Sequence, residues 1–225
     1  MRLIVSGNEL LPAGERPAGT QITDSNGPML AALVRRDGGV VEASHRLLDD
    51  PAAMRRALAR PGADVIVTAG AASVGREDHM PVLVAELGTL AVHGVAMRPS
   101  SPAGIGHIGE ARVLLLPGNP VSCLVAYDFF AGPVIRRLGG LPTAFPYPVA
   151  TLPLAARLVS QIGRTDYARV RVRRGQVEPV AIGGASALSS VTGADGFVVI
   201  PEGSEGSPEG AEVEVHLYRP PEELP

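Results

Sequence analysis

The chain has 225 residues, of which 45% are hydrophobic and 19% are charged, and this composition excludes disorder as a description of the whole protein. Its 20 basic and 23 acidic residues leave a formal net charge of −3, so there is no overall basic field to attract nucleic acid. The single cysteine, Cys123, excludes an internal disulfide framework and is predicted to be a small buried thiol.

Membrane, export and zinc signals are absent from the sequence. No stretch approaches the roughly 20 consecutive apolar residues that a membrane-spanning helix needs, and the N-terminus has no basic region followed by an apolar core. The five histidines are too scattered for the spacing of a conventional zinc site. We therefore predict a cytoplasmic protein that binds neither nucleic acid nor a membrane.

Short apolar strands alternate with helical segments along residues 1–140. Strands are predicted at residues 3–6, 40–43, 63–68 and 90–95, with a hairpin within 103–116. Helices are predicted to begin at Ser25 or Asn26, at the Asp50 cap with Pro51 in the first position, near residue 82, and at Asn119, the last running as one long helix to Gly139-Gly140. This alternation predicts a three-layer α/β/α domain with a mostly parallel sheet.

The texture of the sequence changes after residue 140. Residues 141–148 hold three prolines in eight positions and are predicted to form a semi-rigid linker. Residues 149–225 contain short alternating or apolar segments separated by glycine-rich turns, with no convincing helix. They predict a small all-β, barrel-like domain.

Three glycines, Gly104, Gly106 and Gly109, match the G-x-G-x-x-G pattern of dinucleotide-binding folds. That fingerprint needs a preceding strand and a helix opening at its end, whereas a strand-like segment follows here. The glycines are therefore assigned to a β-hairpin.

The loop after the buried strand at 63–68 is a candidate binding element. Gly70, Ser73, Gly75 and Asp78 follow the carboxyl end of that strand, where small residues let backbone N–H groups approach a ligand oxyanion. Asp78 is a candidate partner for ligand N–H groups or a cation. The alternative is an ordinary strand-to-helix connection with a solvated aspartate.

The turn Pro117-Gly118-Asn119-Pro120 has two interpretations. Structurally, the first proline ends a strand, Gly118 supplies conformational freedom, and Asn119 caps a helix that Pro120 begins. The same geometry directs free helix N–H groups at the sheet edge, with Ser122 as an extra donor. Two such loops after neighbouring strands would form one anion-binding crevice.

Arg98 and Arg164 are candidate oxyanion ligands, because a guanidinium can grip an oxyanion with two hydrogen bonds. The alternative for each is a solvated surface arginine. Asp24, Asp49 and Asp50 are most simply turn and cap residues. No G-x-S-x-G elbow is present, which argues against a serine hydrolase.

Taken together, these segments resemble the molybdopterin molybdenumtransferase family, which includes the E domain of gephyrin. The matching segments run in order along nearly the whole chain: SGNEL (6–10), QITDSN (21–26), DDP (49–51), VTAGAASVGRED (67–78), HGVAMRPSSP (93–102), LPGNPVS (116–122), GRTDYARVRV (163–172), ALSS (187–190) and GFVVIPEG (196–203). The resemblance covers the C-terminal two domains of the family; full-length relatives carry two further domains ahead of them.

The resemblance implies a molybdopterin-binding α/β domain followed by a β-barrel domain. It implies hydrolysis of adenylylated molybdopterin, with molybdate and Mg²⁺, and insertion of molybdenum. It assigns the pterin pocket to nine residues, namely Gly70, Ser73, Gly75, Asp78, Pro117, Gly118, Asn119, Pro120 and Ser122. Asp50 and Asp78 are its catalytic candidates, and Arg98, Arg164 and Ser186 its molybdate candidates. A homodimer and other cofactor-assembly proteins are the implied partners.

Three departures from the family pattern leave a second function open. Where the family has K-P-G-K-P, this chain has Arg98-Pro-Ser-Ser101-Pro, so one lysine is replaced by arginine and the other is lost. Where the family has S-G-G-V-S-V-G, this chain has Ala69-Gly-Ala-Ala-Ser-Val-Gly75. Where the family has T-G-D-E-L, this chain has SGNEL, with Asn8 in place of a carboxylate. The alternative is therefore a non-catalytic protein that holds molybdopterin or the finished cofactor.

Overall fold

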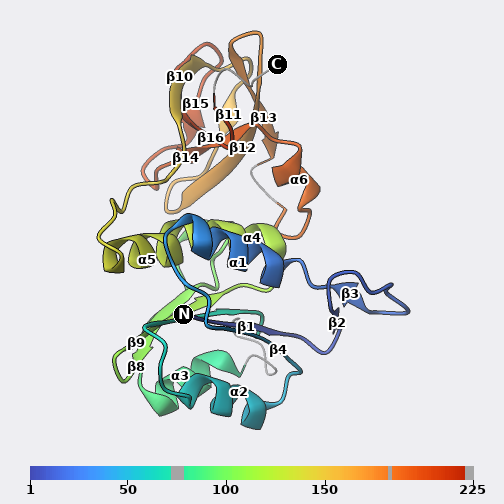
Figure 1. The fold of residues 1–225 in the computed structure, drawn as a ribbon. Coiled ribbons are helices and arrows are strands. Elements are labelled where there is room, and N and C mark those ends of the chain that lie inside the picture. The colour runs from blue at the N-terminus through green and yellow to red at the C-terminus, as the bar shows by residue number, and fades with distance from the viewer. Residues whose placement is uncertain (72–78, 182–183, 221–225) are drawn as a thin grey trace. The chain divides into compact units, whose positions relative to one another are not determined.

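The computed structural model describes residues 1–71, 79–181 and 184–220. The chain forms two compact units, one of residues 1–95 and 102–144 and one of residues 96–101 and 145–225 (Figure 1). The short segment 96–101 thus packs with the second unit, although its neighbours on both sides belong to the first. Arg98 lies on this segment.

A six-stranded sheet forms the middle layer of the first unit, in the order β4-β1-β5-β9-β8-β6. The strands are β4 (Ala43–Leu47), β1 (Arg2–Ser6), β5 (Val65–Ala69), β9 (Ala111–Leu116), β8 (Gly104–Ile108) and β6 (Thr89–His93). The first four run parallel, and β8 and β6 add antiparallel pairs at one side. This confirms the predicted mostly parallel sheet, and the three glycines at 104–109 do lie in a hairpin.

The strand predicted at residues 40–43 is wrong in position, because β4 begins at Ala43. The prediction rested on the apolar pair Val40-Val41, but Val40 is 77% exposed and lies before the first residue that pairs with β1. The real strand has an alternating half-buried pattern and lies at the sheet edge, where one polar face is tolerated.

Helices cover both faces of the sheet (Figure 1). One layer contains α1 (Asn26–Arg36), α4 (Pro120–Ala126) and α5 (Gly132–Leu138); the other contains α2 (Pro51–Ala59) and α3 (Met80–Leu87). Alternate residues of each strand feed separate cores: Leu3 and Val5 pack with Leu30 of α1, whereas Ile4 packs with Met54 of α2. The predicted three-layer order is confirmed. No described helix is long and apolar enough to cross a membrane.

The long helix predicted from Asn119 to residue 139 is interrupted. A π-helical turn, η1 (Tyr127–Ala131), separates α4 from α5. Pro133 lies in the first turn of α5, and a proline in a helix interior lacks the N–H donor and its ring clashes with the carbonyl four residues earlier. A π-turn immediately before the proline accommodates both effects.

A buried ionic cluster fixes the end of α1 to this helix. Asp37 accepts hydrogen bonds from Arg36 (2.9 Å) and from the Tyr127 hydroxyl (2.9 Å), and Arg136 Nη1 lies 2.9 Å from its Oδ1. Burial alone would raise the pKa of Asp37, but these partners outweigh it and hold the pKa below its ordinary value. Burial together with the Asp37 charge raises the pKa of Tyr127, which keeps its hydroxyl protonated as a donor.

The segment that connects β1 to α1 forms a short two-stranded arm, β2 (Leu10–Leu11) with β3 (Ile22–Thr23), which extends away from the six-stranded sheet (Figure 1).

The second unit is rich in strands. Its sheet has the order β10-β16-β14-β12-β13, built from Val149–Pro153, Glu212–Leu217, Gly196–Ile200, Thr165–Arg173 and Gln176–Ala181. A bridge between Leu154 and Val177 joins the regions of β10 and β13 and gives the barrel-like closure that the sequence predicts. β7 (Met97–Arg98) pairs parallel to β12, while β11 (Leu158–Val159) pairs with β15 (Gly206–Ser207). One short helix, α6 (Ser189–Thr192), was not expected.

Candidate functional site

The candidate site lies where three neighbouring parallel strands end. β1, β5 and β9 are adjacent in the sheet, so their carboxyl ends meet at one edge, which is where α/β proteins place their ligands. Ser6 ends β1, Gly70 follows β5, and Gly118 follows β9 by two residues. Gly118 and Asn119 are exposed at this edge.

Two glycines let the strand ends approach one another closely. Gly70 has a φ of +92°, and a Cβ there would lie 2.2 Å from the carbonyl oxygen of Ser6, so no other residue fits without rearrangement. A Cβ on Gly118 would lie 3.3 Å from the Gly70 Cα. Gly118 is not among the positive-φ residues. The conformational freedom predicted for Gly118 is therefore not what the turn uses; the requirement is close packing against Gly70.

Asn26 connects the first turn of α1 to this edge. Its Nδ2 donates a 2.7 Å hydrogen bond to the carbonyl oxygen of Gly118, which fixes the amide so that Oδ1 acts as an acceptor. Asn26 is only 6% exposed, and its Oδ1 is buried without a hydrogen-bond partner. The Oγ of Ser6, at 5% exposure, is likewise buried and unpartnered.

Buried polar atoms without partners are rare and costly in folded proteins. Two of them occur here along one line of contacts that runs from Asn26 through Gly118 and Gly70 to Ser6. An N–H or O–H group that reached these enclosed atoms could donate to Asn26 Oδ1 and exchange a hydrogen bond with Ser6 Oγ. The N-terminus of α1 adds the partial positive charge of its dipole, which favours an anionic group.

Sequence reasoning missed Ser6 and Asn26 as candidate site residues. Asn26 was considered only as a helix cap, yet the cap bond is made by Asp24, whose Oδ1 accepts from the Gly27 amide at 2.9 Å. Ser25 takes the N-cap position without a side-chain bond. A polar residue inside the resembling segment QITDSN was the available signal, but the pairing of Asn26 with Gly118 spans 92 positions and has no local signature.

The Pro117–Pro120 turn forms largely as predicted. β9 ends at Leu116, Pro117 is buried, and Pro120 begins α4. Asn119 takes the N-cap position, but its side chain makes no cap hydrogen bond. Ser122 lies in the first turn of α4 and is 4% exposed. The side chain of Asn119 is consequently not committed to the helix.

Of the two acidic candidates and the remaining pocket candidates, the structure describes only Asp50. Ser73, Gly75 and Asp78 lie outside the described residues. Asp50 caps α2, with its Oδ1 accepting from the Ala52 amide at 2.9 Å, as predicted from the sequence. Its neighbour Asp49 contacts the loop after β1 instead, because the Asn8 amide donates to Asp49 Oδ2 at 3.2 Å and Asn8 Oδ1 accepts from the Asp49 amide. A catalytic role of Asp50 stays a prediction.

Arg98 and Arg164 both contact one buried carboxylate. Arg98 Nε and Nη2 donate to Asp166 Oδ1 and Oδ2 at 3.0 and 2.5 Å, and Arg164 Nε lies 3.2 Å from Oδ1. All three residues belong to the second unit. Ser186 lies in the loop before α6, where its carbonyl oxygen accepts from the Leu188 amide. Within the described residues, no hydrogen bond connects Ser186 to either arginine.

Residues 1–71, 79–181 and 184–220 hold no group of three or more His, Cys, Asp or Glu side chains that could bind a metal ion.

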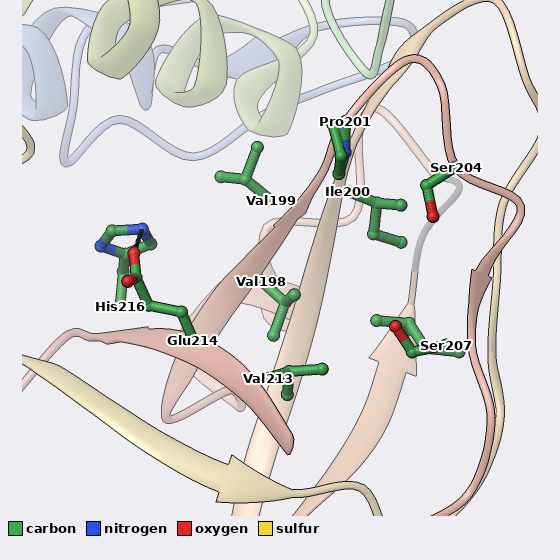
Figure 2. A pocket seen from close by; sticks show the side chains of 10 residues that line it. Val198, Val199, Ile200, Pro201, Ser204, Ser207, Val213, Glu214 and His216 are labelled. Carbon is green, nitrogen blue, oxygen red and sulfur yellow. Dashed lines mark ion pairs between the residues drawn. The ribbon is translucent and has the colours of Figure 1, made fainter. Parts of the chain in front are cut away.

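A cavity of about 140 Å³ opens in the second unit beside β14 and β16, and Figure 2 shows its lining. His216 and Glu214 contact each other at one side, with Nε2 and Oε1 3.4 Å apart, and Ser204 and Ser207 lie at the other. Burial lowers the pKa of His216 although Glu214 opposes the shift, which favours the neutral imidazole near pH 7. None of the predicted site residues lines this cavity, so it is not the candidate site.

Comparison with known proteins identifies both units. Residues 2–137 match the family described as a probable molybdopterin binding domain, and residues 151–218 match the MoeA C-terminal region, domain IV. The chain is 34% identical over 201 residues to a putative molybdopterin biosynthesis protein of Methanocaldococcus jannaschii, covering 88% of this chain and 48% of that protein. It is 33% identical to molybdopterin molybdenumtransferase 2 of Mycobacterium tuberculosis, covering 89% and 52%.

Among solved structures, the molybdopterin biosynthesis MoeA protein of Pyrococcus horikoshii superposes with a TM-score of 0.80 at 32% identity, covering 97% of this chain and 54% of that one. The chain spans about half the length of the curated relatives that it matches.

Proposed function

The chain belongs to the family of the probable molybdopterin binding domain, followed by a MoeA C-terminal region, and on this premise we propose that it binds molybdopterin and acts in inserting molybdenum into it. The proposed substrates are adenylylated molybdopterin and molybdate. The proposed site for the pterin is the carboxyl edge of β1, β5 and β9.

The observation that carries the proposal is the pair of buried, unpartnered atoms Ser6 Oγ and Asn26 Oδ1. A pterin carries ring N–H and amino groups, which are the donors that a fixed amide oxygen lacks here. The glycines at 70 and 118 keep side chains out of the edge, which leaves room for a ligand group to approach the backbone there. Asn119 and Ser122 are further described residues of the proposed pocket, to which the sequence also assigns Ser73, Gly75 and Asp78.

The chemistry we propose is mainly positioning. Hydrolysis of the adenylate releases AMP and needs stabilisation of negative charge on the phosphate oxygens, which helix dipoles and N–H donors supply. Arg98 and Arg164 are the proposed ligands of molybdate. Mg²⁺ stays a prediction that rests on Asp50 and Asp78, and no step is derived through it. A homodimer also stays a prediction.

Two measurements test the proposal. Anaerobic calorimetric titration with molybdopterin measures binding, and chromatographic detection of AMP after incubation with adenylylated molybdopterin, Mg²⁺ and molybdate measures turnover. We expect Asn26→Leu to weaken pterin binding at least tenfold, since it removes the fixed acceptor. Thr68→Val is the matched control, because Thr68 is a buried polar residue of β5 with an unpartnered hydroxyl, enclosed before the strand end. Absence of pterin binding by folded wild-type protein would refute the proposal.

A non-catalytic binder is the second candidate. Asn8 stands where the resembling family has a carboxylate, and its side chain is engaged with the Asp49 amide at 3.0 Å. Ser101 stands where the family has a lysine, which leaves one less cation. Retained pterin affinity with no AMP release, measured on the same sample, would favour this candidate.

A further inference from the structure

A single buried carboxylate, that of Asp166, contacts Arg98 and Arg164 in the second unit. β7 pairs parallel to β12 with Arg98 in register with Asp166, and the Thr165 amide donates to the Ala96 carbonyl at 2.9 Å. The backbone ladder thus brings Arg98 beside Asp166, although 68 positions separate them. The resulting contact is bidentate, which restricts the guanidinium in direction as well as distance.

Two further groups complete the cluster. Arg164 precedes β12, and its Nε lies 3.2 Å from Asp166 Oδ1 as an ion pair without a hydrogen bond, while the hydroxyl of Ser160 donates to Oδ2 at 2.6 Å. Asp166 is fully buried, whereas the side chains of Arg98 and Arg164 are 35% and 29% exposed. Both guanidinium groups therefore rest on an enclosed anion and keep part of their surface open to solvent.

The cluster has more cationic donors than its carboxylate uses. Two arginines and one aspartate leave a net charge of +1, and within the described residues no second acid contacts either arginine. A guanidinium has five N–H donors; Arg98 spends two on Asp166, and Arg164 faces it only through Nε. The remaining donors suit an oxyanion with several acceptor oxygens.

We propose that Asp166 is a positioning residue that holds Arg98 and Arg164 as a pair for a tetrahedral oxyanion of the molybdate type. This inference rests on the proposed function and assigns a role to a residue that would not touch the anion. Asp166 pre-orients two flexible side chains, so their ordering is not paid for when the anion binds. It does so while contributing a negative charge that opposes the anion.

These two effects have opposite signs, and the opposition makes the role testable. If charge alone mattered, removing the carboxylate would raise the net charge of the cluster to +2 and strengthen anion binding. If orientation matters more, affinity falls despite the added charge. Asp166→Asn keeps the side-chain size and separates the two cases.

Asp195→Asn is a matched control in the same unit. Asp195 is 2% exposed and also pairs with two arginines, Arg173 at 3.0 Å and Arg219 at 2.7 Å. The substitution produces the same change in charge, and a comparable loss of stability, away from Arg98 and Arg164. Ser160→Ala is a second test variant, because it loosens Asp166 without any change in charge and so serves even where Asp166→Asn fails to fold.

The experiment is calorimetric titration of the full chain with sodium molybdate and sodium tungstate, without pterin, well below the melting temperature of each variant. We expect Asp166→Asn to weaken binding at least tenfold, Ser160→Ala about threefold, and Asp195→Asn less than twofold. Equal or tighter binding by Asp166→Asn, or an equal loss in Asp195→Asn, would overturn the proposal. Where Asp166→Asn does not fold, unchanged affinity in Ser160→Ala overturns it.

The outcomes also separate this inference from the proposed function. Wild-type protein that binds molybdopterin but neither oxyanion overturns the paired-arginine site and leaves the pterin proposal standing. Wild-type protein that binds molybdate with the expected pattern of variants but no pterin does the reverse.

Discussion

Substitution of Ser6 by alanine should stabilise the free protein and weaken its binding of molybdopterin. The Ser6 hydroxyl is buried at the end of β1 and has no hydrogen-bond partner, so the free-energy cost of its desolvation is not offset by a hydrogen bond in the folded chain. Such a group costs roughly 1–3 kcal/mol, and replacing the hydroxyl by a hydrogen atom removes the polar group at the expense of one small side-chain atom. We expect the free energy of unfolding of the first unit to rise by about 1 kcal/mol.

The same hydroxyl is expected to gain a partner when the pterin is bound. Loss of one neutral hydrogen bond costs about 1 kcal/mol, so the dissociation constant of Ser6→Ala should rise roughly fivefold. Differential scanning calorimetry of the ligand-free protein measures the first effect, which corresponds to a rise of about 2–4 °C in melting temperature for a chain of this size. Titration calorimetry with molybdopterin measures the second.

Thr68→Val controls for the stability effect, since it also removes an unpartnered buried hydroxyl but at a position enclosed within β5. It should stabilise without changing the dissociation constant. A Ser6→Ala protein that melts several degrees lower, with unaltered affinity, would refute the reasoning, because the hydroxyl would then be a structural group.

Three further changes have signs that follow from the structure. Ser100 has a φ of +98°, at a position where the resembling family has glycine. In denaturant unfolding, Ser100→Gly should be about 1 kcal/mol more stable than Ser100→Ala, because both variants lack the hydroxyl and only the alanine keeps the backbone strain; equal stability would contradict this. Because the pKa of Asp37 is lowered in the folded chain, its contribution to stability is present above about pH 4 and is lost as pH falls through the folded pKa. Asp37→Asn should lower the free energy of unfolding by about 3 kcal/mol at pH 7 and make it depend less on pH below about pH 4; an unchanged pH dependence would contradict the role of the ionic cluster. Burial raises the pKa of Cys123, so its thiol should not react with a disulfide reagent at pH 8 until the protein is denatured, and rapid labelling of the native chain would show the packing to be wrong.

The fold was predictable because each unit obeys a local pattern. Continuous apolar runs gave the buried parallel strands, and Asp50-Pro51 and Asn119-Pro120 gave two helix starts to the residue. Errors arose where the deciding partner is distant or competing. β4 was misplaced because an edge strand needs only one apolar face, and the π-turn before Pro133 reflects a backbone conflict that hydrophobic periodicity does not report.

The candidate site was predictable in place but not in its polar atoms. The glycines and the proline turn mark the carboxyl edge, since turn chemistry is local. Ser6 and Asn26 look like an ordinary strand end and an ordinary helix cap in sequence. Their significance comes from burial without a partner, which depends on how β1, β5, β9 and α1 pack, and no periodicity encodes that.

Arg98 and Arg164 show most clearly that a cluster of side chains can be a property of the fold and not of one sequence segment. By position, Arg98 falls within the residues that match the molybdopterin binding domain, and Arg164 within those that match the MoeA C-terminal region. In the structure, both contact Asp166 in the second unit. Arg98 reaches Asp166 because β7 pairs with β12, whereas Arg164 lies only two residues before Asp166. A division of this protein at residue 140 would remove Arg98 from a fully buried carboxylate. Asp166 would keep Ser160 and Arg164 as partners but lose both hydrogen bonds from Arg98, and since losing a partner of a buried charge is destabilising, we expect the second unit to be less stable without the segment 96–101.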